Sequence, residues 1–165
     1  MTSSYWFTPR PKESEHQHPF LVFDGSDRLH LPLTRFGKEA CARVSHKTIQ
    51  VYLYALLPFF TYLETDTWQI RMGLHWNDPP ARIRQALEDY LIQKLQCKVQ
   101  PHRDGWKYVM LTAGTRSSLR IFLAAVKLFY QIMRYLGDYT YPNPLIDSMC
   151  FRYCNSDPFD SDKIA

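Results

Sequence analysis

The 165-residue sequence contains no apolar run of the ~18 residues that a helix needs to cross a membrane. Its first 19 residues are polar and contain proline, so they also lack the basic-then-apolar order of a signal peptide. We therefore expect a cytoplasmic protein with reduced thiols and no membrane partner. Hydrophobic residues make up 45% of the chain, which is enough for the core of one domain.

Metal-binding patterns are also lacking. The four cysteines are Cys41, Cys97, Cys150 and Cys154. Only the last two are close together, whereas a zinc site needs two such pairs, or one pair with closely spaced histidines. His16 and His18 alternate in a polar segment and form no such pair. We expect free thiols, no metal and no cofactor.

No Asp or Glu occurs between Gly105 and Gly137, where the clearest helix of the chain lies. Thr115 is a suitable N-cap and Gly137 a suitable C′ residue, which predicts a helix over residues 115–137. Apolar residues recur along one side of it at ~100° per residue. The other side carries Arg116, Arg120, Lys127, Gln131 and Arg134. A face of one charge sign can follow a phosphate backbone, or it can be a solvated surface that happens to be basic.

The net charge of +4 is unevenly distributed along the chain. Residues 45–137 carry twelve Lys/Arg and six Asp/Glu, whereas residues 138–165 carry two and five. The predicted helical body is thus basic and the C-terminal part acidic. This asymmetry favours a polyanionic partner for the body.

Two other long helices are predicted before the last one. Ser45 is a suitable N-cap for a helix over residues 45–63, in which Pro58 predicts a kink or a break because it removes one amide donor. Asn77 or Asp78 is expected to cap the second helix. Its apolar stripe is Ile83, Leu87, Tyr90, Leu91 and Leu95. In the connector between the two helices, Trp68 and Trp76 are expected to pack on the core.

The remaining segments predict short elements. Alternation of Leu29, Leu31 and Leu33 predicts an extended piece, followed by a short helix over residues 34–43. Residues 97–112 change to a strand period and predict a β-hairpin with a turn at Asp104-Gly105. Its tip is basic through His102, Arg103 and Lys107.

These segments predict a mainly α fold, a helical bundle of three long helices and one or two short ones. A small β-hairpin lies between the second and third long helices. We expect residues 1–19 to be a flexible arm, residues 20–147 the domain, and residues 148–165 an acidic tail or the start of a linker.

In three motifs the chain resembles the N-terminal core-binding domain of tyrosine recombinases, the phage-integrase family. The first similar motif is Ser45, Thr48, Tyr52, Leu56 and Phe59. The second is residues 115–130, which resemble the last helix of that domain, and the third is the exit Tyr141, Asn143, Pro144 and Leu145. The lead-in from Asp24 to Leu33 also resembles some integrases of mobile elements. The similarity covers about residues 20–147.

The resemblance implies a SAM-like bundle that clamps double-stranded DNA together with a C-terminal catalytic domain. Partners would then be duplex DNA, that domain and other recombinase protomers on DNA, at the nucleoid of a bacterial cytoplasm. None of the six histidines is followed three residues later by Arg, so the family's H-x-x-R motif is missing, and no catalytic residue or nucleophilic tyrosine is assigned. The chain itself is not expected to be an enzyme.

DNA contact is the property that carries over residue by residue. Helix starts offer amides, hydroxyls and cations to phosphates, and side chains one turn further can reach base edges. The expected DNA-binding residues are Ser45, His46, Lys47, Thr48, Arg103, Lys107, Thr115, Arg116, Ser117, Arg120, Lys127 and Arg134. Arg120 and Lys127 are the best candidates to face a groove, and Arg82 and Arg84 could also reach a backbone.

Two other functions stay open at this level. The chain could be a stand-alone helical adaptor that binds protein through an aromatic surface, for which Tyr5, Trp6 and Phe7 offer side chains. It could also be a small metal-dependent enzyme, although its His and Cys are scattered rather than grouped. Salt-dependent affinity for DNA separates the recombinase domain from the adaptor.

Overall fold

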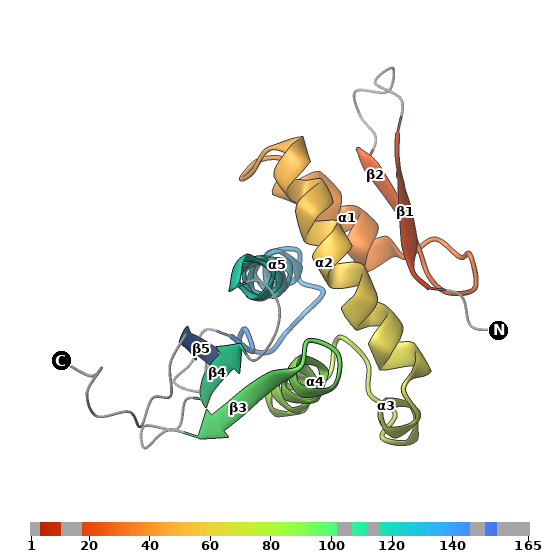
Figure 1. The fold of residues 1–165 in the computed structure, drawn as a ribbon. Coiled ribbons are helices and arrows are strands. Elements are labelled where there is room, and N and C mark those ends of the chain that lie inside the picture. Colours follow the sequence, from red (N-terminus) through yellow and green to blue (C-terminus); the bar gives the residue numbers. More distant parts are fainter. Residues whose placement is uncertain (1–3, 11–17, 102–106, 112–115, 146–150, 155–165) are drawn as a thin grey trace.

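The structure is a computed structural model that describes residues 4–10, 18–101, 107–111, 116–145 and 151–154. It is rich in α-helix, as predicted. The helices in these parts are α1 (Leu31–Ala40), α2 (His46–Thr65), α3 (Thr67–Arg71), α4 (Pro80–Gln93) and α5 (Arg116–Tyr135). The strands are β1 (Trp6–Pro9), β2 (Phe20–Phe23), β3 (Cys97–Pro101), β4 (Lys107–Leu111) and β5 (Phe151–Cys154). They form a β1–β2 pair and a β3–β4–β5 sheet, which lie on opposite sides of the helices (Figure 1).

The core is centred on the contact between α2 and α5. Phe59 of α2 meets Phe122 of α5 edge to face with ring centroids 5.8 Å apart, and Phe60 meets Phe129 at 5.3 Å. The predicted apolar side of α5 is buried: Phe122, Ala125, Val126, Phe129, Ile132 and Met133. The helical period therefore identified the inward face of this helix correctly.

Helix α2 runs through Pro58 without the break that was one of the two expected outcomes. The proline deprives the carbonyl of Tyr54 of its helical donor. Both residues lie on the exposed side, and Tyr54 is 70% exposed, so water can hydrate that carbonyl. On the other side, Leu56 and Phe59 are buried and hold the two halves of α2 against the core.

The expected flexible arm contains a strand, so the expectation is wrong for Trp6–Pro9. β1 pairs antiparallel with β2, with Trp6 opposite Phe23 and Phe7 opposite Val22. The buried Tyr5 fastens this hairpin to α2, because its backbone N–H donates to the Thr61 hydroxyl over 3.0 Å. The pairing joins segments distant along the chain, which a local pattern does not reveal.

The predicted extended piece over Leu29–Leu33 is wrong beyond Leu29, which forms an isolated bridge to Phe23. α1 begins at Leu31, three residues before the predicted start, and ends at Ala40. His30 is its N-cap, and its Nδ1 accepts from the backbone N–H of Leu33 over 3.3 Å. Pro32 suits the first turn, where a helix needs no amide donor.

The predicted side-chain cap of α4 is also wrong. Pro79 occupies the N-cap position of α4 and makes no side-chain bond. Asp78 instead forms an ion pair with Arg82, with 3.2 Å between Nη1 and Oδ2, and Asn77 is exposed. The first turn of α4 thus relies on its prolines, whose φ is already helical.

The apolar stripe of α4 is confirmed, with Leu95 half-buried and the other four residues buried. Trp76 packs against the core as expected, its ring centroid 5.5 Å from that of Phe129. Trp68 does not: it lies on the short helix α3 and is 53% exposed.

The predicted β-hairpin is confirmed as β3 and β4, which pair antiparallel from Cys97–Leu111 to Pro101–Lys107. Its predicted turn at Asp104-Gly105 lies outside the described residues. Phe151–Cys154 pair in parallel with β4 as β5, so the expectation of a tail or linker is wrong for these four residues.

Gly137 ends α5 as predicted. Its φ is +80°, which a residue with a Cβ rarely adopts. The N–H of Asp138 donates to the carbonyl of Met133 over 2.9 Å, and that of Gly137 to Arg134 over 3.1 Å. These two bonds are the Schellman pattern that satisfies the last carbonyls of a helix. The predicted cap Thr115 lies outside the described residues.

Candidate nucleic-acid interface

The exposed side of α5 carries a stripe of basic residues. Arg120, Lys127 and Arg134 are all exposed, and no acidic residue occurs in α5. They are seven residues apart, or two helical turns, so they are nearly in line and spaced about 10 Å along the axis. The stripe of about 21 Å matches the rise of roughly six nucleotides in one DNA strand. Gln131 lies half-buried between the last two.

The start of α2 has the geometry of a capped helix N-terminus. The Ser45 hydroxyl accepts from the backbone N–H of Thr48 over 3.2 Å. Ser45, His46 and Lys47 are exposed, and Thr48 is half-buried. No acidic residue occurs in the first turn, so Lys47 and the helix dipole both favour an anion here.

The described contacts place this helix start beside β2 rather than beside the stripe on α5. The ring of His46 lies 6.0 Å from that of Phe20, edge to face. α5 instead crosses α2 further along, at Phe59 and Phe60. The two groups of predicted DNA-binding residues are thus separate basic positions on one bundle.

Five of the predicted residues have no described side chain. Arg103 and Thr115 lie outside the described residues. Lys107 is the first residue of β4, and Arg116 and Ser117 open α5, but only their backbones are described. Their contact with DNA stays a prediction.

The two arginines of α4 make contacts within the protein. Arg82 pairs with Asp78 and also donates to the carbonyl of Met72. Arg84 is half-buried and donates to the carbonyl of Pro144 over 3.5 Å. Both guanidinium groups hold parts of the fold together, and their contact with a DNA backbone stays a prediction.

The exit segment is fixed to the back of the α5 stripe. Asn143 is buried, and its Nδ2 donates to the backbone carbonyl of Lys127 over 2.9 Å. Its Oδ1 accepts from the N–H of Leu145 over 3.0 Å. Asn143 therefore connects the chain that leaves α5 to the helical turn that presents the Lys127 side chain.

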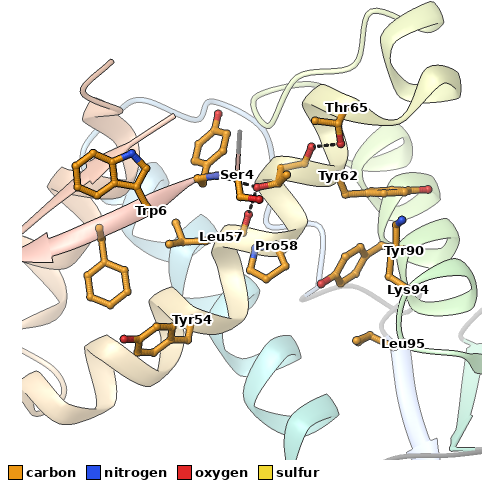
Figure 2. A pocket seen from close by; sticks show the side chains of 13 residues that line it. Ser4, Trp6, Tyr54, Leu57, Pro58, Tyr62, Thr65, Tyr90, Lys94 and Leu95 are labelled. Carbon is orange, nitrogen blue, oxygen red and sulfur yellow. Dashed lines mark hydrogen bonds between the residues drawn. The ribbon is translucent and has the colours of Figure 1, made fainter. Parts of the chain in front are cut away.

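A concave surface lies along the second half of α2. Its volume is about 710 Å³, and its floor is the α2 face from Tyr54 to Thr65. One wall is the start of the chain, Ser4 to Phe7, and the other is the end of α4, with Tyr90, Lys94 and Leu95. Figure 2 shows the Tyr90 ring beside Pro58, with its hydroxyl directed into this groove. We call this surface the aromatic groove.

Sequence reasoning identified some of these residues but not the site. Tyr5, Trp6 and Phe7 were candidates for an aromatic surface, and the structure places all three in one wall of the aromatic groove. Tyr90 was assigned only to the apolar stripe of α4. Its hydroxyl was the available signal, since a core position in an apolar stripe does not need one.

Metal ligands do not gather in the described part of the chain: no three His, Cys, Asp or Glu side chains there are grouped to hold an ion. Across the same residues, no helix has both the length and the hydrophobicity to cross a bilayer. Comparison of the chain with protein-family models, curated proteins and solved structures found no match.

Proposed function

We propose that this chain is a DNA-binding domain, of the kind that tyrosine recombinases use to hold duplex DNA during integration and recombination. The observation that supports this most is the single-sign stripe of Arg120, Lys127 and Arg134 on an exposed helix face. A stripe of this length can approach several phosphates of one strand at once. The resemblance of the N-terminal, last-helix and exit motifs to the core-binding domain supplies the recombinase part of the proposal.

In this proposal the domain binds DNA and does no chemistry. The α5 stripe lies along the backbone, with Arg120 and Lys127 able to reach base edges from a groove. The start of α2 presents Lys47, hydroxyls and free amides to a phosphate. A separate catalytic domain carries out strand cleavage, and duplex DNA is the shared partner of both.

The test is binding to a fluorescent generic duplex by anisotropy over a series of salt concentrations. Wild-type affinity should fall steeply with salt. The variant Arg120→Ala/Lys127→Ala should bind more weakly, with a log–log salt slope smaller by about 2 if both side chains meet phosphates. Circular dichroism should stay native-like, because both side chains are exposed.

A matched control removes the same charge elsewhere. Arg71 and Lys98 are exposed on α3 and on the edge strand β3, and neither is among the predicted DNA-binding residues. Arg71→Ala/Lys98→Ala should change the salt slope little. Equal slopes for the two double variants would mean that only net charge matters, and would remove α5 from the binding face.

A further inference from the structure

The aromatic groove has a donor that the fold does not use. The Tyr90 residue is only 5% exposed, but its hydroxyl faces the groove (Figure 2) and bonds to no group among the described residues. The hydroxyl of a largely buried tyrosine normally has a hydrogen-bond partner. Burial raises the pKa of Tyr90 to about 12, so the hydroxyl stays protonated at neutral pH and can donate.

A cation lies beside this donor. Lys94 is one helical turn after Tyr90 and also lines the aromatic groove, with its Nζ 5.9 Å from the centroid of the Tyr62 ring. Lys94 forms no ion pair with an acidic residue in the described parts of the chain. Glu64, on the neighbouring α2, instead accepts a hydrogen bond from the Tyr5 hydroxyl. The α4 wall of the groove thus presents two donors, which suit a carboxylate.

The opposite wall presents exposed aromatic rings that the fold already holds in place. Trp6 is 42% exposed, yet it stacks on Phe23 at 4.3 Å and donates from Nε1 to Asp27 over 2.8 Å. Phe7 contacts Tyr54 edge to face at 5.0 Å. Exposed aromatic side chains with little freedom left to lose are typical of protein-binding surfaces.

The floor has the length for a short chain segment. It follows α2 over twelve residues, from Tyr54 to Thr65, or about 16 Å of helix axis. About five residues of extended peptide have that length. The hydroxyls of Thr61 and Thr65 donate to backbone carbonyls one turn earlier, so the floor is mostly apolar, with Leu57 and Pro58 at its centre.

We propose that the aromatic groove binds an extended peptide segment of a partner protein, in which an aromatic or large aliphatic side chain stands next to an acidic one. The apolar side chain packs between Trp6 and Tyr54 over Pro58. The carboxylate accepts from the Tyr90 hydroxyl and pairs with Lys94. This interaction is separate from DNA binding, because the groove is built by β1, α2 and α4 rather than by the basic face of α5.

The experiment starts from a random peptide library displayed on phage and selected on the whole chain. Peptides that also bind the Tyr90→Phe/Lys94→Met variant are removed. The expected result is a family of peptides with Phe, Trp, Tyr or Leu adjacent to Asp or Glu. Failure to enrich any peptide over the variant, or enrichment of peptides without an acidic residue, would overturn the proposal.

Affinities of one selected peptide then test each contact. Tyr90→Phe removes only the hydroxyl and should weaken binding about tenfold, as should Lys94→Met. Replacing the peptide's acidic residue by its amide should weaken wild-type binding to the same degree and change the Lys94→Met affinity little. Tyr135→Phe, at an exposed position on α5, is the matched control and should bind like wild type.

Two further results separate this groove from the DNA interface. Arg120→Ala/Lys127→Ala should bind the peptide normally even where its DNA affinity is reduced. Displacement of the peptide by duplex DNA would instead assign the groove to nucleic acid and overturn the peptide proposal. If the peptide with the amide bound as tightly as the peptide with the acidic residue, the proposed role of Tyr90 and Lys94 would be overturned.

Discussion

His30 should make this protein sensitive to mild acid. Its ring lies between those of Tyr5 and Phe60, with both centroids 5.3 Å away. Burial lowers its pKa from the usual 6.5 to about 4, and only Asp24 opposes this shift. The Nδ1 atom accepts from the Leu33 N–H, so a proton on that atom would also remove the cap of α1.

The sign and size of the effect follow from this pKa. Between pH 6.5 and 4 the unfolded chain binds a proton at His30 and the folded chain does not, so the free energy of unfolding falls as pH falls. A shift from 6.5 to about 4 makes this loss about 3 kcal/mol between pH 7 and pH 4. Below pH 4 both states are protonated and the loss from this residue stops.

The assay is denaturant unfolding, followed by circular dichroism, at several pH values between 7 and 4. His30→Asn keeps a side chain that can cap a helix but cannot titrate there. The variant will be less stable at every pH because it loses ring contacts. The informative quantity is therefore the change in its free energy of unfolding between pH 7 and pH 4. That change should be smaller by about 3 kcal/mol than in wild type. His75→Asn, at an exposed position, should leave the pH dependence of the free energy of unfolding as in wild type. A wild-type-like pH dependence in His30→Asn would refute the reasoning.

Two other substitutions test the packing around α5. Phe129→Ala should lower the free energy of unfolding by about 3–5 kcal/mol, because the ring is buried and contacts four other aromatic rings. A loss under about 1 kcal/mol in denaturant titration would contradict this packing. Asn143→Ala should cost about 1–3 kcal/mol by removing the two hydrogen bonds that its amide makes to the Lys127 carbonyl and the Leu145 N–H, whereas the exposed Asn77→Ala should be near neutral.

The elements that sequence predicted well are those whose determinants are local. α5 has an apolar residue every three or four positions and a glycine where φ must be positive, so both its inward face and its end were predictable. The strands β3 and β4 are separated by only five residues in the sequence, and their pairing was predictable for the same reason. In each case neighbours along the chain determine the structure.

The errors arose where distant contacts decide. Pro58 removes one hydrogen bond, but buried residues on both sides of it secure α2, and tertiary packing outweighs the local cost. The alternation of Leu29, Leu31 and Leu33 suggested an extended piece, yet Leu33 and Thr34 are buried as helix residues. The Thr34 hydroxyl accepts from the backbone N–H of Val22 in β2 over 3.1 Å. The strands β1 and β5 both pair with segments that their own sequences do not indicate.

The same distinction explains why one surface could be predicted and the other could not. The basic stripe lies on a single helix, so a seven-residue spacing in the sequence is enough to place its charges in line. The aromatic groove requires the chain start, the middle of α2 and the end of α4 to meet, and no spacing connects Trp6, Pro58 and Lys94. A DNA proposal could therefore be made before the structure was known, whereas the peptide proposal depends on it. The variants that separate the two activities test whether one bundle uses both surfaces.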